Sequence, residues 1–221
     1  MISIEKTSIY GFDQAIRGMR NPMNSWDRSD SNWDFVEDTS IINPEDQVKL
    51  IVGPNDHKLM TELAKAGPVH AKYRRMIVVY ADVTAPLYWW KEYDTYKVGT
   101  VANSCSTMHK IHSKEFTLDD FSHEHLTPLS MDALNTVVDM LNHYREDFLL
   151  TKSKDDWWQM IQLLPSSYNQ KRTIMLNYEV LTNIYDSRRH HKLDEWQTFC
   201  DWIKTLPYSE IITDHHENVN Q

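Results

Sequence analysis

The stretch from Asp94 to His112 (DTYKVGTVANSCSTMHKIH) gathers hydroxyl, amide, lysine, histidine and cysteine side chains within nineteen residues. Ser, Thr and Asn side chains compete with the backbone for hydrogen bonds, so such a cluster favours a loop over a regular helix or strand. The same groups bind phosphate oxygens and the polar edges of bases. The stretch is therefore either a solvated loop or a polar pocket for a ligand.

Arg188 is a second candidate. We predict a helix over 172–187, on which Asn177, Leu181, Ile184 and Arg188 follow one another at spacings of four, three and four and so share one face. Leu181 and Ile184 mark that face as buried, and a buried Arg needs an anionic or multiply accepting partner. The alternative is an Arg at a helix end, stabilised by the helix dipole and by nearby acidic side chains.

Other reactive residue types form no recognisable catalytic or metal-binding pattern. The histidine pairs at 109–112 and 123–125 have spacings that could ligate a metal, but no third ligand is implied, so we expect no metal site. Cys105 lies in the polar stretch, and Cys200 offers no disulfide framework with it. HExxH and GxSxG motifs do not occur in the sequence.

Composition narrows the class of protein. The chain has 221 residues and a formal net charge of −9, which argues against a nucleic-acid polymer as the partner. Its five glycines form neither a GxGxxG motif nor a P-loop, so any nucleotide cofactor must be held in another way. No apolar run is long enough to span a membrane, and the N-terminus does not resemble a signal peptide, so we expect a cytoplasmic protein.

The surrounding elements indicate a single α+β domain over residues 1–221, rich in helix and with a small sheet. We expect a strand in RRMIVVYADVT (74–84), a long polar loop over 20–47 that Trp26, Trp33 and Phe35 help to pack, and a frayed tail over 214–221. Further helices are expected over residues 56–66 (Asn55 as N-cap, Gly67 as terminator), 86–98, 130–150 and 193–205. In the helix over 130–150, one apolar stripe comprises Leu134, Val137, Val138, Leu141 and Phe148.

Two stretches resemble the flavin-dependent thymidylate synthases, the ThyX family. That family reads A-P-apolar, then Gln, RHR, S, NE, S and RY, and APLYWWKEYDTYKVGTVANSCSTMH is similar in layout. The positions that correspond are Glu92 (Gln), Thr95–Lys97 (RHR), Thr100 (first Ser), Asn103 and Ser104 (NE), Ser106 (second Ser), and Met108 and His109 (RY).

The second stretch runs from Leu164 to Arg188 and reproduces the family's LP, N-x-R and final R spacing without a gap. Asn177 and Arg188 match the Asn and the final Arg. Glu179 stands where the family has its middle Arg. Upstream, LMTELAKAGPVHAKYRRMIVVYADVTAP resembles the family's helix, GHxSPFEH turn and strand, with Tyr73 and Arg74 in place of Glu-His.

The resemblance implies a ThyX-like fold with a small antiparallel sheet, a homotetramer, and a reaction in which a pyrimidine deoxynucleotide such as dUMP is methylated at C5. FAD would be the cofactor, and NADPH and methylenetetrahydrofolate the co-substrates. The residues it implies are Ser106 and Arg188 for catalysis, Lys97, Thr100, Asn103 and Asn177 for the cofactor, and Glu92, Ser104, Ser106, His109 and Arg188 for the substrate.

The departures leave rival functions open. Met108 and Glu179 replace two arginines that bind phosphate in the family, and only Lys97 remains of its basic pair. Arg172, Lys110 or Arg189 would have to supply the charge, or the ligand differs. The alternatives are a non-catalytic protein that binds a nucleotide or another small ligand on the same fold, and a structural or interaction protein that shares only the fold.

Overall fold

The computed structural model describes residues 2–35 and 48–214. Its backbone packs into two compact units. We call residues 1–7 with 81–174 unit 1, and residues 8–80 with 175–221 unit 2. The expectation of a single domain stays a prediction. The expected tail lies almost entirely outside the described residues, as does part of the expected 20–47 loop.

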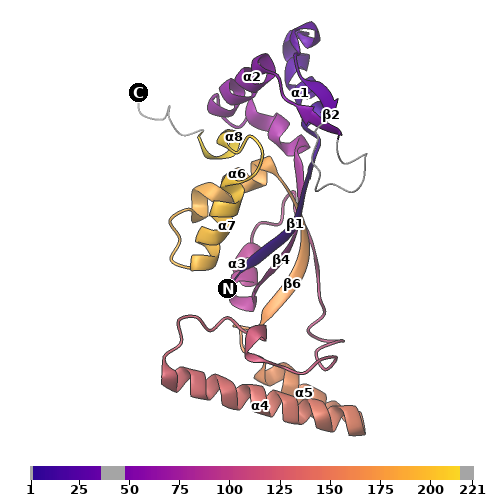
Figure 1. The fold of residues 1–221 in the computed structure, drawn as a ribbon, viewed down its shortest axis with the longest axis vertical. Helices are drawn as coiled ribbons and strands as arrows, with labels where there is room; N and C mark the ends of the chain where they lie inside the picture. Colours follow the sequence, from indigo (N-terminus) through magenta and orange to yellow (C-terminus); the bar gives the residue numbers. More distant parts are fainter. Residues whose placement is uncertain (1, 36–47, 215–221) are drawn as a thin grey trace. The chain divides into compact units, whose positions relative to one another are not determined.

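The chain forms a four-stranded sheet with the strand order β1-β4-β6-β5, of which Figure 1 labels β1, β4 and β6. The strands are β1 (Ser3–Tyr10), β4 (Val78–Pro86), β6 (Asn169–Asn177) and β5 (Val101–Ser104). Along β4, Val79, Ala81, Val83 and Ala85 are all buried, as the two-residue period of a strand requires. This confirms the strand expected there, although it begins at Val78, after a 3₁₀ turn over Ala71–Met76.

The helix expected over 172–187 is wrong in its first third. Residues up to Asn177 belong to strand β6, and helix α6 covers only Tyr178–Arg188. Within β6, Ile174 and Leu176 are buried while their neighbours are less so, an alternation that fits a strand beside β4 and not a helix face. Asn177 therefore sits at the helix N-cap. It does not share a helical face with Leu181.

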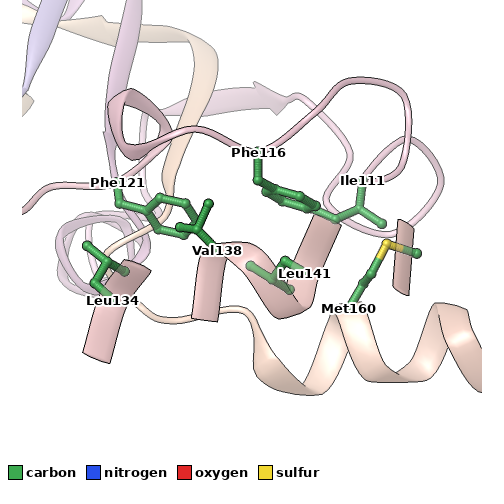
Figure 2. Close-up of a cluster of buried hydrophobic side chains, with 7 residues drawn as sticks. All are labelled: Ile111, Phe116, Phe121, Leu134, Val138, Leu141 and Met160. Carbon is green, nitrogen blue, oxygen red and sulfur yellow. The ribbon is translucent and has the colours of Figure 1, made fainter. Parts of the chain in front are cut away.

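Unit 1 contains helices α3 (Leu87–Tyr93), α4 (Pro128–Thr151) and α5 (Lys154–Leu163), and α4 and α5 lie side by side (Figure 1). The apolar stripe expected on α4 is confirmed, and α5 was not predicted. Leu134, Val138 and Leu141 of α4 are buried against Met160 of α5 and against three side chains of the preceding segment (Figure 2). Those three side chains are Ile111, Phe116 and Phe121.

Helix α3 is shorter than expected, ending at Tyr93. Trp89, Trp90 and Tyr93 are all buried within unit 1, and Trp90 Nε1 donates to Gln170 O at 2.8 Å. The pair of tryptophans thus forms core packing. Because these three rings are covered within the protomer, they offer no aromatic surface to another subunit.

Unit 2 contains the remaining helices and a two-stranded antiparallel hairpin. The helices are α1 (Phe12–Arg20), α2 (Pro54–Lys65), α6, α7 (Asp194–Lys204) and α8 (Glu210–Thr213), and the hairpin joins β2 (Asn32–Phe35) to β3 (Val48–Ile51). Short 3₁₀ turns cover Asn21–Met23 and Trp26–Arg28 in the region expected to be irregular. Helices α2 and α7 were predicted, whereas α1, α8 and β1 were not.

At α2 the residue predicted to end the helix is confirmed, and the predicted N-cap is wrong. Gly67, with φ of +97°, ends the helix as expected, because that backbone conformation is costly for other residues. The predicted cap Asn55 is inside the helix, since Gly53 is the N-cap. The carboxylate of Asp30 accepts from the backbone N–H groups of Asn55 and Asp56 at 2.9 and 3.1 Å and so replaces the missing side-chain cap. Among the described residues, no helix is long and apolar enough to cross a membrane.

Candidate functional site

The polar stretch singled out in the sequence borders a cavity of about 520 Å³ that lies wholly in unit 1. Cys105, Ser106, Thr107, Lys110 and Lys114 line one side. Strand β4 and the chain at the start of β6 contribute Thr84, Tyr168, Asn169, Gln170 and Lys171, and the segment after the polar stretch contributes further residues as far as Asp120. The stretch is therefore a pocket wall and not only a solvated loop.

Backbone and amide hydrogen bonds attach both ends of the segment 105–122 to the start of strand β6. Cys105 N–H donates to Lys171 O at 2.9 Å, and Gln170 Nε2 donates to Cys105 O at 2.8 Å. At the other end, Ser122 N–H donates to Ser167 O at 2.8 Å and its hydroxyl to Asn169 Oδ1 at 2.9 Å. Both ends of the pocket wall are thus held against one strand.

The middle of the segment is held by helices α4 and α5. Asn142 bonds Phe116 twice: its Oδ1 accepts from Phe116 N–H at 2.8 Å and its Nδ2 donates to Phe116 O at 2.9 Å. Arg145 Nε donates to His112 O at 3.1 Å, and Trp157 Nε1 donates to Met108 O at 3.0 Å. Together with the buried apolar side chains of Figure 2, these bonds fix a stretch that has little regular structure of its own.

The charges at the cavity are mixed. Lys114 Nζ forms an ion pair with Asp120, and Lys171 Nζ lies 3.2 Å from Glu5 Oε2 and 3.4 Å from Asp82 Oδ2. These pairs neutralise two of the three lysines, and Lys110 is exposed at the rim. Burial, together with the nearby Asp120 and Cys105, raises the pKa of Tyr168, so its hydroxyl stays protonated and can donate at neutral pH.

Ser106 is the predicted site residue that lines this cavity. Its Oγ accepts from the backbone N–H groups of Met108 and His109 at 3.2 and 2.8 Å. Because the oxygen already accepts two bonds, the hydroxyl hydrogen can be donated to a carbonyl or phosphate oxygen. The geometry suits Ser106 as a ligand donor, and within the part of the chain that the structure describes no general base that would make it a nucleophile is bonded to it.

The other residues predicted in unit 1 lie outside the wall of this cavity. They are Glu92, Lys97, Thr100, Asn103, Ser104 and His109. Thr100 Oγ1 donates to Tyr96 O at 2.5 Å, while Asn103 and Ser104 sit exposed on the short strand β5. Arg172, considered as a substitute charge, bonds Asp94 at 2.8 Å and stacks on Trp90 at 4.3 Å, so it acts in the structure of unit 1.

The two predicted residues in unit 2 have structural contacts. Asn177 Oδ1 accepts from Val180 N–H at 3.0 Å and caps α6. Arg188 ends α6 beside the buried Leu181 and Ile184, as the spacing predicted, and its guanidinium carbon lies 4.8 Å from the centre of the Trp196 ring. The ligand roles assigned to both residues stay predictions.

Glu179, which replaces an Arg in the resemblance, faces two arginines of unit 2. Its Oε2 lies 3.9 Å from Arg74 Nη1 and its Oε1 lies 3.9 Å from Arg75 Nη2. Arg74 is itself buried and donates to Ala64 O at 3.3 Å. The negative charge at 179 is therefore compensated inside unit 2.

Several cavity residues were missed in the sequence. They are Thr84, Lys114, Asp120, Tyr168, Gln170 and Lys171. Lys114 and Asp120 follow closely on the polar stretch, and extending the candidate segment would have included them. Thr84 and Lys171 carry no local signal, because they reach the cavity only through strand pairing. Among the described residues, no group of three or more His, Cys, Asp or Glu side chains could hold a metal ion.

Comparison with known proteins identifies the fold. No protein-family model matches the chain, and no curated protein matches its sequence. Among solved structures, the chain is similar to ThyX from Helicobacter pylori crystallised with FAD and dUMP, with a TM-score of 0.67 and 14% identity over 98% of this chain and 100% of that one.

A second similar structure is the UMP/dUMP methylase PolB from Streptomyces cacaoi bound with 5-Br dUMP. Its TM-score is 0.63 and its identity 13%, over 96% of this chain and 94% of that one. At such identities the likeness establishes the fold and not the activity. The protein is an α+β chain with the fold of the ThyX flavin-dependent thymidylate synthases.

Proposed function

We propose that the protein binds a pyrimidine nucleoside monophosphate, dUMP or a relative, and methylates it at C5 with the help of FAD. The observation that carries this proposal is the fold likeness, over nearly the whole chain, to two proteins with nucleotides of this class. The cavity in unit 1 supports it, since Cys105, Ser106 and Thr107 of its wall belong to the segment that resembles the ThyX nucleotide-binding stretch.

The cavity suits a nucleotide in chemistry as well as in place. Lys110 supplies an exposed positive charge, and Ser106 and Tyr168 supply hydroxyl donors for phosphate or carbonyl oxygens. A volume of about 520 Å³ lies within the usual range for small-molecule sites. Ser106 and Arg188 are the residues that we propose for catalysis, with Glu92, Ser104 and His109 as further substrate contacts.

The residues proposed for FAD form a donor set that fits a diphosphate-linked cofactor. Lys97 offers a charge and Asn103 an amide, both exposed, and Thr100 offers a partly exposed hydroxyl. Asn177 keeps its Nδ2 as a donor while its Oδ1 caps α6. Bound FAD would supply the two-electron redox chemistry, with NADPH and methylenetetrahydrofolate as co-substrates in a homotetramer.

The alternative is a non-catalytic nucleotide-binding or small-ligand-binding protein on the same fold. Glu179 favours it, because this side chain faces Arg74 and Arg75 and cannot replace a phosphate-binding Arg. Met108, also at an Arg position, does not line the cavity, and its carbonyl oxygen accepts the bond from Trp157. The methylation proposal requires both flavin and a nucleotide to bind, whereas the alternative requires only a nucleotide or another small ligand.

Two measurements on the purified full chain test the proposal. With added FAD we expect oxidised-flavin absorbance that a chemical reductant bleaches, and by calorimetry we expect dUMP to bind. Lys110→Gln should weaken dUMP binding about fivefold or more, whereas Lys154→Gln, an exposed control on α5, should change it less than about twofold. Nucleotide binding without flavin binding would favour the alternative, and the loss of both would overturn the proposal.

A further inference from the structure

A second cavity, of about 310 Å³, lies wholly in unit 2 and has a different composition. Residues of α1, of the turns that follow it and of the β2–β3 hairpin surround it. The residues that carry the argument are Arg17, Arg20, Trp26, Ser29, Ser31 and Trp33. None of them belongs to the nucleotide site proposed above.

Two half-exposed tryptophans border this cavity. Trp26 is 50% exposed and Trp33 is 55% exposed, although both were expected to pack inside a loop. Trp26 is held in one orientation, because its Nε1 donates to Asn21 Oδ1 at 2.8 Å. Trp33 stands on strand β2 opposite Leu50, which also lines the cavity. Indole rings held at a cavity mouth offer faces on which a planar ring can stack.

The floor of the cavity is preorganised by a buried ion pair. Arg20 is 4% exposed, and its Nε donates to Asp56 Oδ1 at 2.6 Å while Nη1 donates to Ser25 O at 3.2 Å. A guanidinium carries five N–H donors, so donors remain for a ligand in the cavity that Arg20 lines. A site whose charged side chain is already fixed loses less entropy when it binds.

The same carboxylate holds the cavity wall. Asp56 Oδ2 accepts from the hydroxyls of Ser29 and Ser31 at 2.7 and 2.6 Å and from the backbone N–H groups of Asp30 and Ser31 at 3.1 and 3.0 Å. Residues 29–31 connect the turn that carries Trp26 to the strand that carries Trp33. The spacing between the two indoles is therefore set by a network that includes Arg20.

The charges that line the cavity favour an anion. Arg17 and Arg20 contribute two positive charges, and Asp13 contributes one negative charge. Asp56 neutralises Arg20 from behind, so Arg17 is the charge that a ligand would meet at the rim. An aromatic ring and an anionic group are together the chemistry that this wall can recognise.

We propose that this cavity binds a small planar aromatic ring that carries a carboxylate or a phosphate. The ring stacks on Trp26 and Trp33, and the anionic group is held by Arg17 with support from Arg20. The inference does not depend on the proposed methylation of a nucleotide, since the two cavities lie in different units.

The full chain has eight tryptophans. The test labels them with 5-fluorotryptophan and follows their signals by ¹⁹F NMR. The Trp26 and Trp33 signals are assigned by Trp26→Phe and Trp33→Phe. The probes are 2-naphthoate as an aromatic carboxylate and UMP as an aromatic phosphate, and cyclohexanecarboxylate is the control without an aromatic face. We expect at least one aromatic probe to shift both signals, and the control to shift neither.

Two charge variants complete the test. Arg17→Gln should raise the dissociation constant of the active probe about fivefold or more, and Lys58→Gln, which removes an exposed charge from α2, should change it less than about twofold. The active probe identifies the anionic group. Three results would overturn the inference: both signals stay fixed at probe concentrations up to about 10 mM, the control shifts them equally, or Arg17→Gln has no effect.

Discussion

At the scale of single residues, the charges that depart from the ThyX pattern are paired with each other. Glu179 stands at an Arg position and Arg74 at a His position of the family motif, and the structure places these two side chains 3.9 Å apart. Arg20 and Asp56 form another internal pair, which is buried, and the Asp56 carboxylate accepts five hydrogen bonds. Charged residues that look like ligand contacts in the sequence thus act partly within the fold.

We expect Asp56→Asn to destabilise the protein by about 3–5 kcal/mol, because the change leaves the Arg20 charge buried without its partner. Urea unfolding followed by circular dichroism measures this loss. The matched control is Asp201→Asn, which removes a carboxylate from an exposed pair with Lys204 and should cost less than about 1 kcal/mol. Equal losses in the two variants would contradict a structural role for the buried pair.

The difference in stability between wild type and Asp56→Asn should depend on pH. Burial alone would raise the pKa of Asp56, but hydrogen bonds from Ser31, Ser29 and Arg20 outweigh it and hold the pKa below its usual 3.8. A carboxylate with a lowered folded-state pKa stabilises the fold above its unfolded pKa, and this stability is lost as the pH falls through the folded pKa. The stability gap between wild type and Asp56→Asn should therefore be full above about pH 4 and shrink below it.

Arg188→Lys tests the ligand role proposed for Arg188. Lys keeps the charge beside Trp196 but lacks the paired donors of a guanidinium, so we expect dUMP affinity to fall about tenfold while the melting temperature changes by only a few degrees. Calorimetry and thermal unfolding measure the two effects. Unchanged affinity with a large fall in melting temperature would show that Arg188 serves only the packing of α6 on α7.

At the scale of elements, the hairpin of α4 and α5 gives the segment 105–122 its shape. The segment has almost no regular structure, yet Asn142, Arg145 and Trp157 bond its backbone and three of its apolar side chains are buried on the hairpin. The amphipathic stripe of α4, which is visible in the sequence, therefore positions the polar residues that line the cavity.

Asn142→Ala should loosen this segment. Two hydrogen bonds to Phe116 are lost and a partly buried N–H and C=O lose their partner, so we expect a destabilisation of about 1–3 kcal/mol and weaker dUMP binding. Chemical unfolding and calorimetry provide the measurements. Thr136→Ala, at an exposed position of the same helix, is the control and should leave both unchanged. Lost stability with unchanged dUMP affinity would place the nucleotide elsewhere.

At the scale of the whole molecule, the surface of α4 carries apolar side chains that a single chain leaves exposed. Leu129 and Leu150 are 81% and 83% exposed, and Met140 and Leu149 are each about two-fifths exposed. Leu129 and Met140, eleven residues apart, share one side of the helix, and exposed apolar side chains on one face can mark a surface that another subunit covers. These exposed side chains are the structural reason to expect that another subunit covers part of α4.

We expect a stable oligomer, a tetramer, by light scattering at micromolar concentration. Leu129→Glu with Leu150→Glu should shift the protein toward smaller species if α4 forms the interface, because two charges would be buried there. Lys154→Gln with Asp155→Asn on α5 serves as a surface control. A wild-type monomer would contradict the predicted assembly.

Local patterns in the sequence were sufficient to predict the helices and strands whose apolar residues recur at a clear spacing. The stripe of α4, the helix α7 and the strand β4 were all predicted, and the motif layout around Ser106 and Arg188 indicated the ThyX-like fold that the comparisons confirm. These features could be read because side-chain period follows directly from backbone geometry.

The tertiary structure decided what depends on pairing between distant residues. Residues 172–177 have an apolar pattern that suits either a helix or a strand, and only their place between β4 and β5 makes them β6. Strand pairing also carries Thr84 and Lys171 to the wall beside Ser106, and contact with two arginines determines the role of Glu179. No local signal encodes these contacts, because each forms only when segments far apart in the sequence pack together.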